Sequence, residues 1–234
     1  MDTKTRQYEN FLRQELSHPI TQEVLGQEKL KISGNLREGI EKRFDTPKQN
    51  ALLFLHSSQD ILGDTEFAIE TFKKHISSND RLHEGQMYLL IYGVLNAIYM
   101  QVQSFETLYE TFNLDKKSSN LAGIKNLRIL QLRHKVAAHP LNYGKANKAA
   151  ECFRLIRNSV TNPEAIKIMN INNDIETFNL HTCLDEYSGQ KELLLNNFIT
   201  ILIDKLYGDN SEKKKELLGK LQLITDGKLK SSTV

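Results

Sequence analysis

The sequence predicts a mainly α protein, a bundle of four to five core helices with one β-hairpin inserted before the last core helix. Three observations lead to this fold class. The 234 residues include only 4 Pro and 12 Gly and no Trp, a composition that disfavours a turn-rich β-sandwich. Apolar residues recur at helical spacing along most of the chain. Only the segment 164–187 alternates apolar and polar residues with a period of two.

Residues 1–45 are expected to form an N-terminal helical arm. Four apolar residues repeat at helical spacing within residues 4–16, namely Tyr8, Phe11, Leu12 and Leu16. We expect His18-Pro19 to break this helix, because a proline disfavours the α conformation of the residue before it. The rest of the arm reads as short helical pieces separated by glycines.

Residues 46–210 are expected to contain the helical bundle. Thr46-Pro47 is a plausible helix cap, with the proline at the first helical position, and the helix that follows runs to about Ser77. A second long helix is expected over 86–113. It is apolar on nearly all sides near its middle, which predicts a central place in the bundle.

Two shorter helices are expected next, over 121–138 and 145–159. The segment 164–187 then alternates around an Asn-Asn-Asp turn, which predicts a β-hairpin with Ile166, Ile168 and Asn170 on one face. The last core helix is expected over 190–207. The C-terminal segment 211–234 reads as a basic amphipathic tail with a short helix.

The charge of the chain is unevenly distributed. The formal net charge is +2, yet residues 116–158 hold ten Lys or Arg and a single acidic residue, Glu151. That segment therefore carries +9 and the remainder −7. A basic segment of this kind offers a footprint for phosphate groups. The alternative is a solvated face that balances the acidic helices.

Several features predict a cytoplasmic protein without a membrane partner. The first residues lack the apolar core of a signal peptide. The longest apolar run, 87–100, is too short for a bilayer, which takes about 20 apolar residues. Cys152 and Cys183 form no C-x-x-C pair, so neither a disulfide framework nor a thiolate metal site is expected.

The stretch "RHKVAAHP" holds the candidate catalytic residues. On an α-helical wheel Arg133 projects between the apolar residues Ile129, Val136 and Ala137, where a solvated arginine is unusual. His139 follows six positions later, and Pro140 is expected to end the helix there.

An arginine binds phosphate through a permanently charged fork, and a histidine transfers protons near neutral pH. Together they suit RNA cleavage by attack of the 2′-hydroxyl on its own phosphate. No carboxylate cage for Mg²⁺ accompanies the motif, so neither a metal nor another cofactor is expected.

Structural explanations compete with this one. Arg133 can instead be a buried arginine paired with Glu66 or Glu70 on a facing helix. His139 can be a helix cap, since cations are favoured at a helix C-terminus. His134 alone reads as an ordinary surface histidine.

An Arg, a polar residue after it and a His at the end of the motif resemble the R-x(4–6)-H signature of HEPN domains. The resemblance covers roughly residues 84–207. HEPN domains are four- to five-helix bundles of toxins, anti-phage systems and RNA-processing enzymes, and active members build a composite site across a symmetric dimer. The resemblance implies that Arg133 holds the scissile phosphate and that His139 is the general acid or base. It also implies that His134 orients or polarises the reacting groups.

The sequence thus predicts a metal-independent HEPN-type endoribonuclease, with tRNA as a candidate substrate, acting as a toxin or anti-phage defence effector. The expected partners are RNA, a second copy of the chain, and an antitoxin or defence-system protein. The expected RNA-binding residues are Arg128, Lys135, Lys145 and Lys148. The alternative is a non-catalytic HEPN-like module that binds RNA or protein and assembles a defence or toxin–antitoxin complex.

Overall fold

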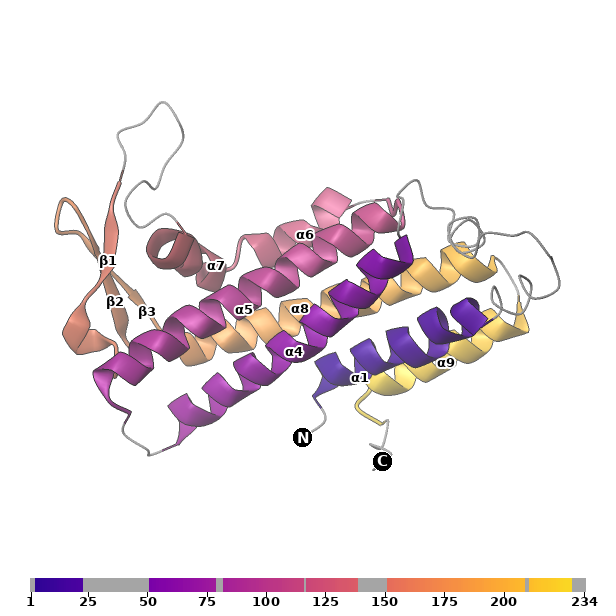
Figure 1. The fold of residues 1–234 in the computed structure, drawn as a ribbon, viewed down its shortest axis with the longest axis horizontal. Helices are drawn as coiled ribbons and strands as arrows, with labels where there is room; N and C mark the ends of the chain where they lie inside the picture. Colours follow the sequence, from indigo (N-terminus) through magenta and orange to yellow (C-terminus); the bar gives the residue numbers. More distant parts are fainter. Residues whose placement is uncertain are drawn as a thin grey trace. The chain divides into compact units, whose positions relative to one another are not determined.

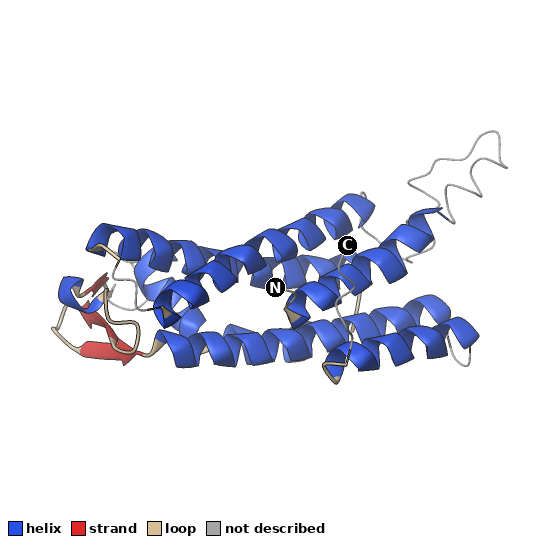
Figure 2. Cartoon of the chain, turned by 90° about the horizontal axis from the view of Figure 1, so that it is seen from below, coloured by secondary structure: helices blue, strands red, loops and turns tan. Residues whose placement is uncertain are grey.

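A computed structural model describes residues 3–22, 51–78, 82–115, 117–138, 151–208 and 211–228. Within them the chain is mainly α, as predicted (Figure 1). The strands in this part of the chain form one small antiparallel sheet (Figure 2). The chain divides into two compact units. Unit 1 comprises Met1–Gly63, Gln103–Leu121 and Lys191–Val234, and unit 2 comprises Asp64–Val102 and Ala122–Gln190.

Unit 1 begins with helix α1, Lys4–Phe11, which continues as a π-helix over Leu12–Ser17 and stays helical to residue 22. The expected break at His18-Pro19 is therefore wrong. A proline inside an α-helix clashes with the carbonyl four residues earlier. The π-helix relieves this constraint, because its wider turn lets the His18 amide donate to the Arg13 carbonyl five residues back.

Helix α9, Glu212–Thr225, lies beside α1 in unit 1 (Figure 1). The hydroxyl groups of Tyr8 and Thr225 are 3.2 Å apart, and Lys220 Nζ lies 2.9 Å from Glu15 Oε2. Apolar side chains of both helices are buried. Two helices that the sequence places in separate terminal segments therefore share one small core.

Three long helices each contribute to both units: α4 (Ala51–Ser77), α5 (Glu84–Thr111) and α8 (Leu180–Tyr207). The first two confirm the predicted long helices over their described lengths, while the proposed cap at Thr46-Pro47 lies outside the described residues. Helix α8 begins earlier than the predicted 190. No helix in the described part is both long and apolar enough to cross a membrane.

The single helix predicted over 121–138 is wrong, because the chain forms two helices there. Helix α6 spans Lys117–Lys125 and α7 spans Arg128–Arg133. Leu127 is extended between them, with φ −63° and ψ 145°. The side-chain amide of Gln131 donates to the Asn126 carbonyl at 3.2 Å, which satisfies a backbone group at the break.

The helix predicted over 145–159 is wrong in its described part, where the chain forms the first strand of a three-stranded sheet and then a short 3-10 helix over Arg157–Ser159. Strands β1 (Phe153–Leu155), β2 (Ile166–Asn170) and β3 (Ile175–Phe178) pair antiparallel in that order. Phe153 and Leu155 are buried on either side of exposed Arg154, which is the period-two pattern of a strand. The predicted hairpin is confirmed in β2 and β3, with Ile168 opposite Glu176. It ends at Phe178 rather than continuing toward residue 187.

Candidate functional site

Arg133 is the last residue of α7 and belongs to unit 2. It is half-buried, and its neighbours Ile129 and Val136 are 0% and 3% exposed, so the expected apolar flanks are present on these two sides. Ala137, the third expected flank, is exposed. The guanidinium is thus held at the border of the core rather than turned fully into solvent.

The ring of Tyr99, on α5, lies beneath the Arg133 guanidinium. Arg133 Cζ is 3.5 Å from the ring centroid. A guanidinium over an aromatic face gains about 0.5–2 kcal/mol, with the larger values where water is excluded. Arg133 Nε is buried and has no hydrogen-bond partner among the described residues. Stacking on Tyr99 therefore fixes the plane of the cation, and no carboxylate in the described part of the chain neutralises it.

His134 lies against the same tyrosine. Its ring is 6.1 Å from the Tyr99 ring and meets it edge to face at 81°. His134 Nδ1 is 3.4 Å from Arg133 Nη1, a long contact for a hydrogen bond. Tyr99 thereby positions both the arginine and the histidine that begin the motif.

The backbone changes from α-helix to π-helix immediately after Arg133. The π-helix spans His134–Ala138. Short π-helical segments are rare and occur often at functional sites. The wider turn of a π-helix separates successive residues by fewer degrees of rotation than an α-helix does. The motif is therefore displayed on a backbone that an α-helical wheel does not describe.

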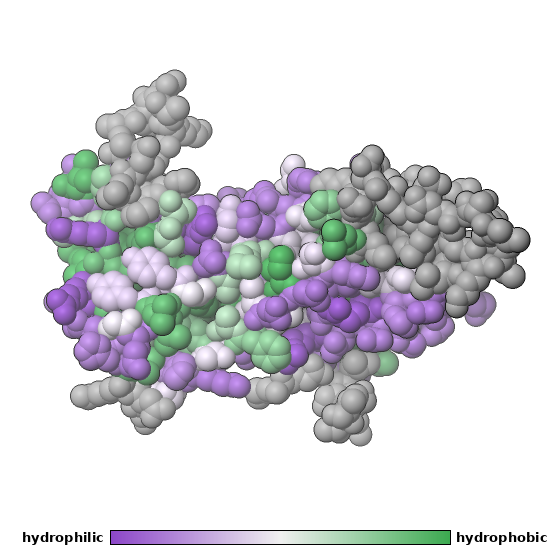
Figure 3. All heavy atoms as spheres, in the orientation of Figure 1, coloured by the Kyte–Doolittle hydropathy of each residue, from purple (hydrophilic) through white to green (hydrophobic). Residues whose placement is uncertain are grey.

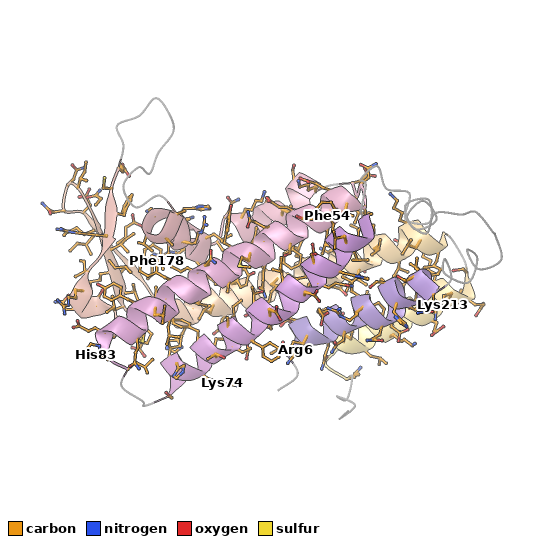
Figure 4. All side chains as sticks on the ribbon, viewed as in Figure 1. Arg6, Phe54, Lys74, His83, Phe178 and Lys213 are labelled. Carbon is orange, nitrogen blue, oxygen red and sulfur yellow. The ribbon has the colours of Figure 1, made fainter. Side chains whose placement is uncertain are left out.

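Lys135 and Arg128, two expected RNA-binding residues, contact the sheet. Lys135 forms an ion pair with Glu176 and lies 4.8 Å from the Phe153 ring centroid, and its side chain is 13% exposed. Arg128 Nη2 donates to the Thr177 carbonyl at 2.9 Å. Its guanidinium lies 4.8 Å from the ring of Phe178, at the end of β3 (Figure 4).

These contacts differ in what they leave available to a ligand. The Lys135 ammonium is mostly covered and already has a carboxylate partner, whereas Arg128 is exposed. Arg128 is consequently the better placed of the two to meet a phosphate. Lys135 fastens the motif segment to the sheet.

The alternative pairing of Arg133 with Glu66 or Glu70 is not found within the described residues. Glu66 is buried and accepts a hydrogen bond from Gln101 Nε2 at 3.2 Å. Gln101 Oε1 accepts in turn from the Tyr187 hydroxyl at 2.8 Å. Burial, and then the charge of Glu66, raise the pKa of Tyr187 well above its usual value, so this hydroxyl stays protonated and remains a donor.

His139, Lys145 and Lys148 lie outside the described residues, so their expected roles stay predictions. Among the described residues no three His, Cys, Asp or Glu side chains gather in an arrangement that could hold a metal ion. Of the seven expected site residues, Arg133 and His134 are brought together directly, and Arg128 and Lys135 join the same helical segment to the sheet.

Tyr99 is the residue of this site that the sequence does not reveal. It lies in the apolar run of α5, where a tyrosine reads as part of the core or of a subunit interface. Its contact with Arg133 bridges 34 positions of the chain and depends on the packing of α7 against α5. The local signal was the presence of three tyrosines in one otherwise apolar segment, Tyr88, Tyr92 and Tyr99.

A comparison of the chain with models of protein families, with curated proteins and with solved structures finds no match. The resemblance to HEPN domains therefore rests on the motif residues alone.

Proposed function

We propose that this chain is a metal-independent endoribonuclease of the HEPN type, with tRNA as a candidate substrate. The observation that supports this function most is the environment of Arg133. Its guanidinium is stacked at 3.5 Å on Tyr99, with a buried Nε that has no hydrogen-bond partner among the described residues. Keeping a half-buried cation unpaired costs free energy, and an anionic ligand that pairs with it removes this cost. A phosphate diester is the anion that suits a guanidinium fork.

The reaction needs two proton transfers and one stabilised charge. The 2′-hydroxyl of the substrate loses its proton to a base as its oxygen bonds to the neighbouring phosphorus. The bond from phosphorus to the 5′-oxygen breaks, and that oxygen takes a proton from an acid. The products are a 2′,3′-cyclic phosphate and a free 5′-hydroxyl. His139 serves as base or acid, because an imidazole exchanges protons near neutral pH.

Arg133 stabilises the charge that develops on the phosphate oxygens during this exchange. A donor held in place before the reaction contributes more than a mobile one, because it need not reorganise in the transition state. Tyr99 supplies that restraint through the stack. His134, edge-on to the same ring, orients the cluster.

The complete site is composite, built from Arg133 and His139 of two copies of the chain in a homodimer. The biological role in this proposal is that of a toxin or anti-phage effector in the cytoplasm, held in check by an antitoxin or defence-system partner. These elements follow from the resemblance to HEPN domains.

Cleavage of purified tRNA in EDTA tests the proposal. Wild-type protein is expected to cut, whereas Arg133→Ala and His139→Ala are expected to lose at least about 100-fold in rate, the usual loss when one charge-stabilising donor or one proton-transfer group is removed. Arg133→Lys is expected to stay impaired, because an ammonium lacks the planar fork and stacks poorly. Folded wild-type protein that binds tRNA and does not cut it would favour the non-catalytic binding module instead.

A further inference from the structure

A row of tyrosines runs along one face of α5 toward Arg133. Taking Tyr88 as the origin of the helical wheel, Tyr92, Asn96 and Tyr99 follow at about 40°, 80° and 20°. Large apolar side chains are exposed in several places on the molecule, as the green spheres in Figure 3 show. On α5 the exposed ones belong to this face and its border, where Tyr92 is 40% and Leu89 is 75% exposed.

The first two rings of the row are stacked on each other. The centroids of Tyr88 and Tyr92 are 6.4 Å apart and their planes differ by 19°. Two nearly parallel and partly exposed rings present flat apolar surface in a fixed orientation. The bases of single-stranded nucleic acids stack on such surfaces, and each base stacked in this way contributes substantially to affinity.

Positive charge lies at both ends of the row. Arg133 covers Tyr99 at one end. At the other end Arg157 lies near Tyr88, and its Nε is 2.7 Å from Glu84 Oε2. The Arg157 side chain remains 81% exposed, so it can meet a second anion while paired with Glu84. The hydrogen bond to Glu84 and, more weakly, the charge of Tyr88 raise the pKa of Arg157.

The helix between these two arginines carries no charge of its own. From residue 85 to residue 105 the sequence of α5 contains no Asp, Glu, Lys or Arg. Tyr88 and Tyr99 are eleven residues apart, which corresponds to about 16 Å along the helix. The face thus combines stacking rings, a neutral floor and terminal cations, and it has no carboxylate in its middle to repel a phosphate backbone.

We propose that this tyrosine row, Tyr88, Tyr92 and Tyr99 between Arg157 and Arg133, binds single-stranded RNA and leads it to Arg133. Bases stack on the rings of Tyr88 and Tyr92, and phosphates meet the two guanidinium groups. The proposal rests on the proposed function in one respect, that Arg133 contacts the same RNA. It narrows the substrate to unpaired segments, such as loops and ends, because the faces of paired bases are already occupied by stacking in a helix.

Charge favours RNA over a second protein surface as the occupant. Arg133, which no carboxylate among the described residues pairs, complements a polyanion at one end, and the 81% exposed Arg157, beside Glu84, can bind a further phosphate at the other. The stacked pair of rings suits planar bases. The exposed Leu89 beside the row extends the apolar surface under a base. A second copy of the chain is the competing occupant, and the experiment separates the two.

The test uses a fluorescein-labelled oligouridylate with a 2′-O-methyl group on every ribose. This RNA cannot be cut, because it lacks the attacking hydroxyl, so binding is measured apart from catalysis. Binding to the full-length protein is followed by fluorescence anisotropy. Tyr92→Ala is expected to weaken it about 5- to 150-fold, the loss that corresponds to one stacked base. Tyr92→Phe keeps the ring and is expected to bind like wild type.

Phe54→Ala is the matched control variant. Phe54, labelled on α4 in Figure 4, is also 40% exposed but lies on a different helix, and its removal is expected to leave binding unchanged. A duplex of the same length is expected to bind more weakly than the single strand and to be insensitive to Tyr92→Ala. Thermal melts followed by circular dichroism check that each variant is folded.

Three results would overturn the proposal. The first is an unchanged affinity of Tyr92→Ala for the uncleavable RNA, and the second is a loss of affinity in Tyr92→Phe equal to that in Tyr92→Ala. The third is a change of oligomeric state in Tyr92→Ala, measured by light scattering, which would assign the row to a subunit interface. Any of these with normal tRNA cleavage in EDTA would leave the nuclease proposal intact. If the protein binds RNA through the Tyr92 ring but does not cleave tRNA, the result would support RNA binding by the tyrosine row and contradict the proposed nuclease activity.

Discussion

Arg133 is stacked on an aromatic ring, and the carboxylate partner that the sequence offered as an alternative is not found within the described residues. The stack on Tyr99 accounts for how a half-buried guanidinium remains in place although no ion pair neutralises it within the described residues. Its buried Nε still lacks a hydrogen-bond partner there. A site that holds a cation in this way is prepared for an anionic ligand, because the ligand supplies the missing interaction.

Replacing Tyr99 tests this arrangement at the residue scale. Tyr99→Leu removes the ring face, and we expect the kcat of RNA cleavage to fall roughly 3- to 30-fold, since the cation–π contact contributes about 0.5–2 kcal/mol. Tyr99→Phe keeps the face and is expected to stay close to wild type. Single-turnover rates with a defined RNA provide the measurement. Equal rates in both variants would show that the stack does not position Arg133.

Arg133 also shows which features of the site can be predicted from the sequence and which cannot. Its placement between Ile129 and Val136 followed from helical periodicity, and both neighbours are buried. The ring beneath it could not be predicted, because Tyr99 is distant in sequence and three tyrosines in an apolar segment do not show which of them meets the arginine. The competing pairing with Glu66 was chemically reasonable, but Glu66 receives its hydrogen bond from Gln101.

The motif segment and the sheet are joined by Lys135. Its ion pair with Glu176 and its contact with Phe153 fasten the π-helix His134–Ala138 to β3 and β1. The element that carries the motif is therefore held on one side by the sheet and on the other by Tyr99. Both contacts restrict the motion of the segment that displays the motif.

Lys135→Met is expected to lower the free energy of unfolding by about 1–2 kcal/mol, because it removes a charged hydrogen bond from a partly buried pair. The affinity for uncleavable RNA is expected to change little, since the ammonium is mostly covered. Urea unfolding and anisotropy measure the two quantities. Glu176→Gln is the matched partner variant. A large loss of RNA affinity in Lys135→Met with unchanged stability would show that Lys135 binds RNA, as the sequence predicts.

The elements themselves were predictable where their signal is local. Long periodic segments predicted α4 and α5, and the alternation around Asn172-Asn173-Asp174 predicted the hairpin. Strand β1 was mistaken for helix because its three residues follow a run of good helix formers and its strand character depends on pairing with β2. The break at Leu127 was missed because no glycine or proline marks it.

In the proposed mechanism, at the scale of the whole molecule, catalysis requires a second copy of the chain. If Arg133 and His139 of different copies form one site, a mixture of the two inactive variants restores it in part. We expect Arg133→Ala and His139→Ala to be inactive separately and to cut RNA after they are mixed and allowed to exchange subunits. Native mass spectrometry would confirm that mixed dimers form. Mixed dimers without cleavage would contradict a site shared between copies.

The most direct test of the account is the chemistry of the RNA ends produced in EDTA. Wild-type protein, freed of metal, is incubated with tRNA beside folded Arg133→Ala, and the new ends are mapped and analysed for their phosphate. We expect 2′,3′-cyclic phosphates and 5′-hydroxyls from wild type alone. Ends of another chemistry, cleavage that EDTA abolishes, or equal cleavage by Arg133→Ala would contradict it.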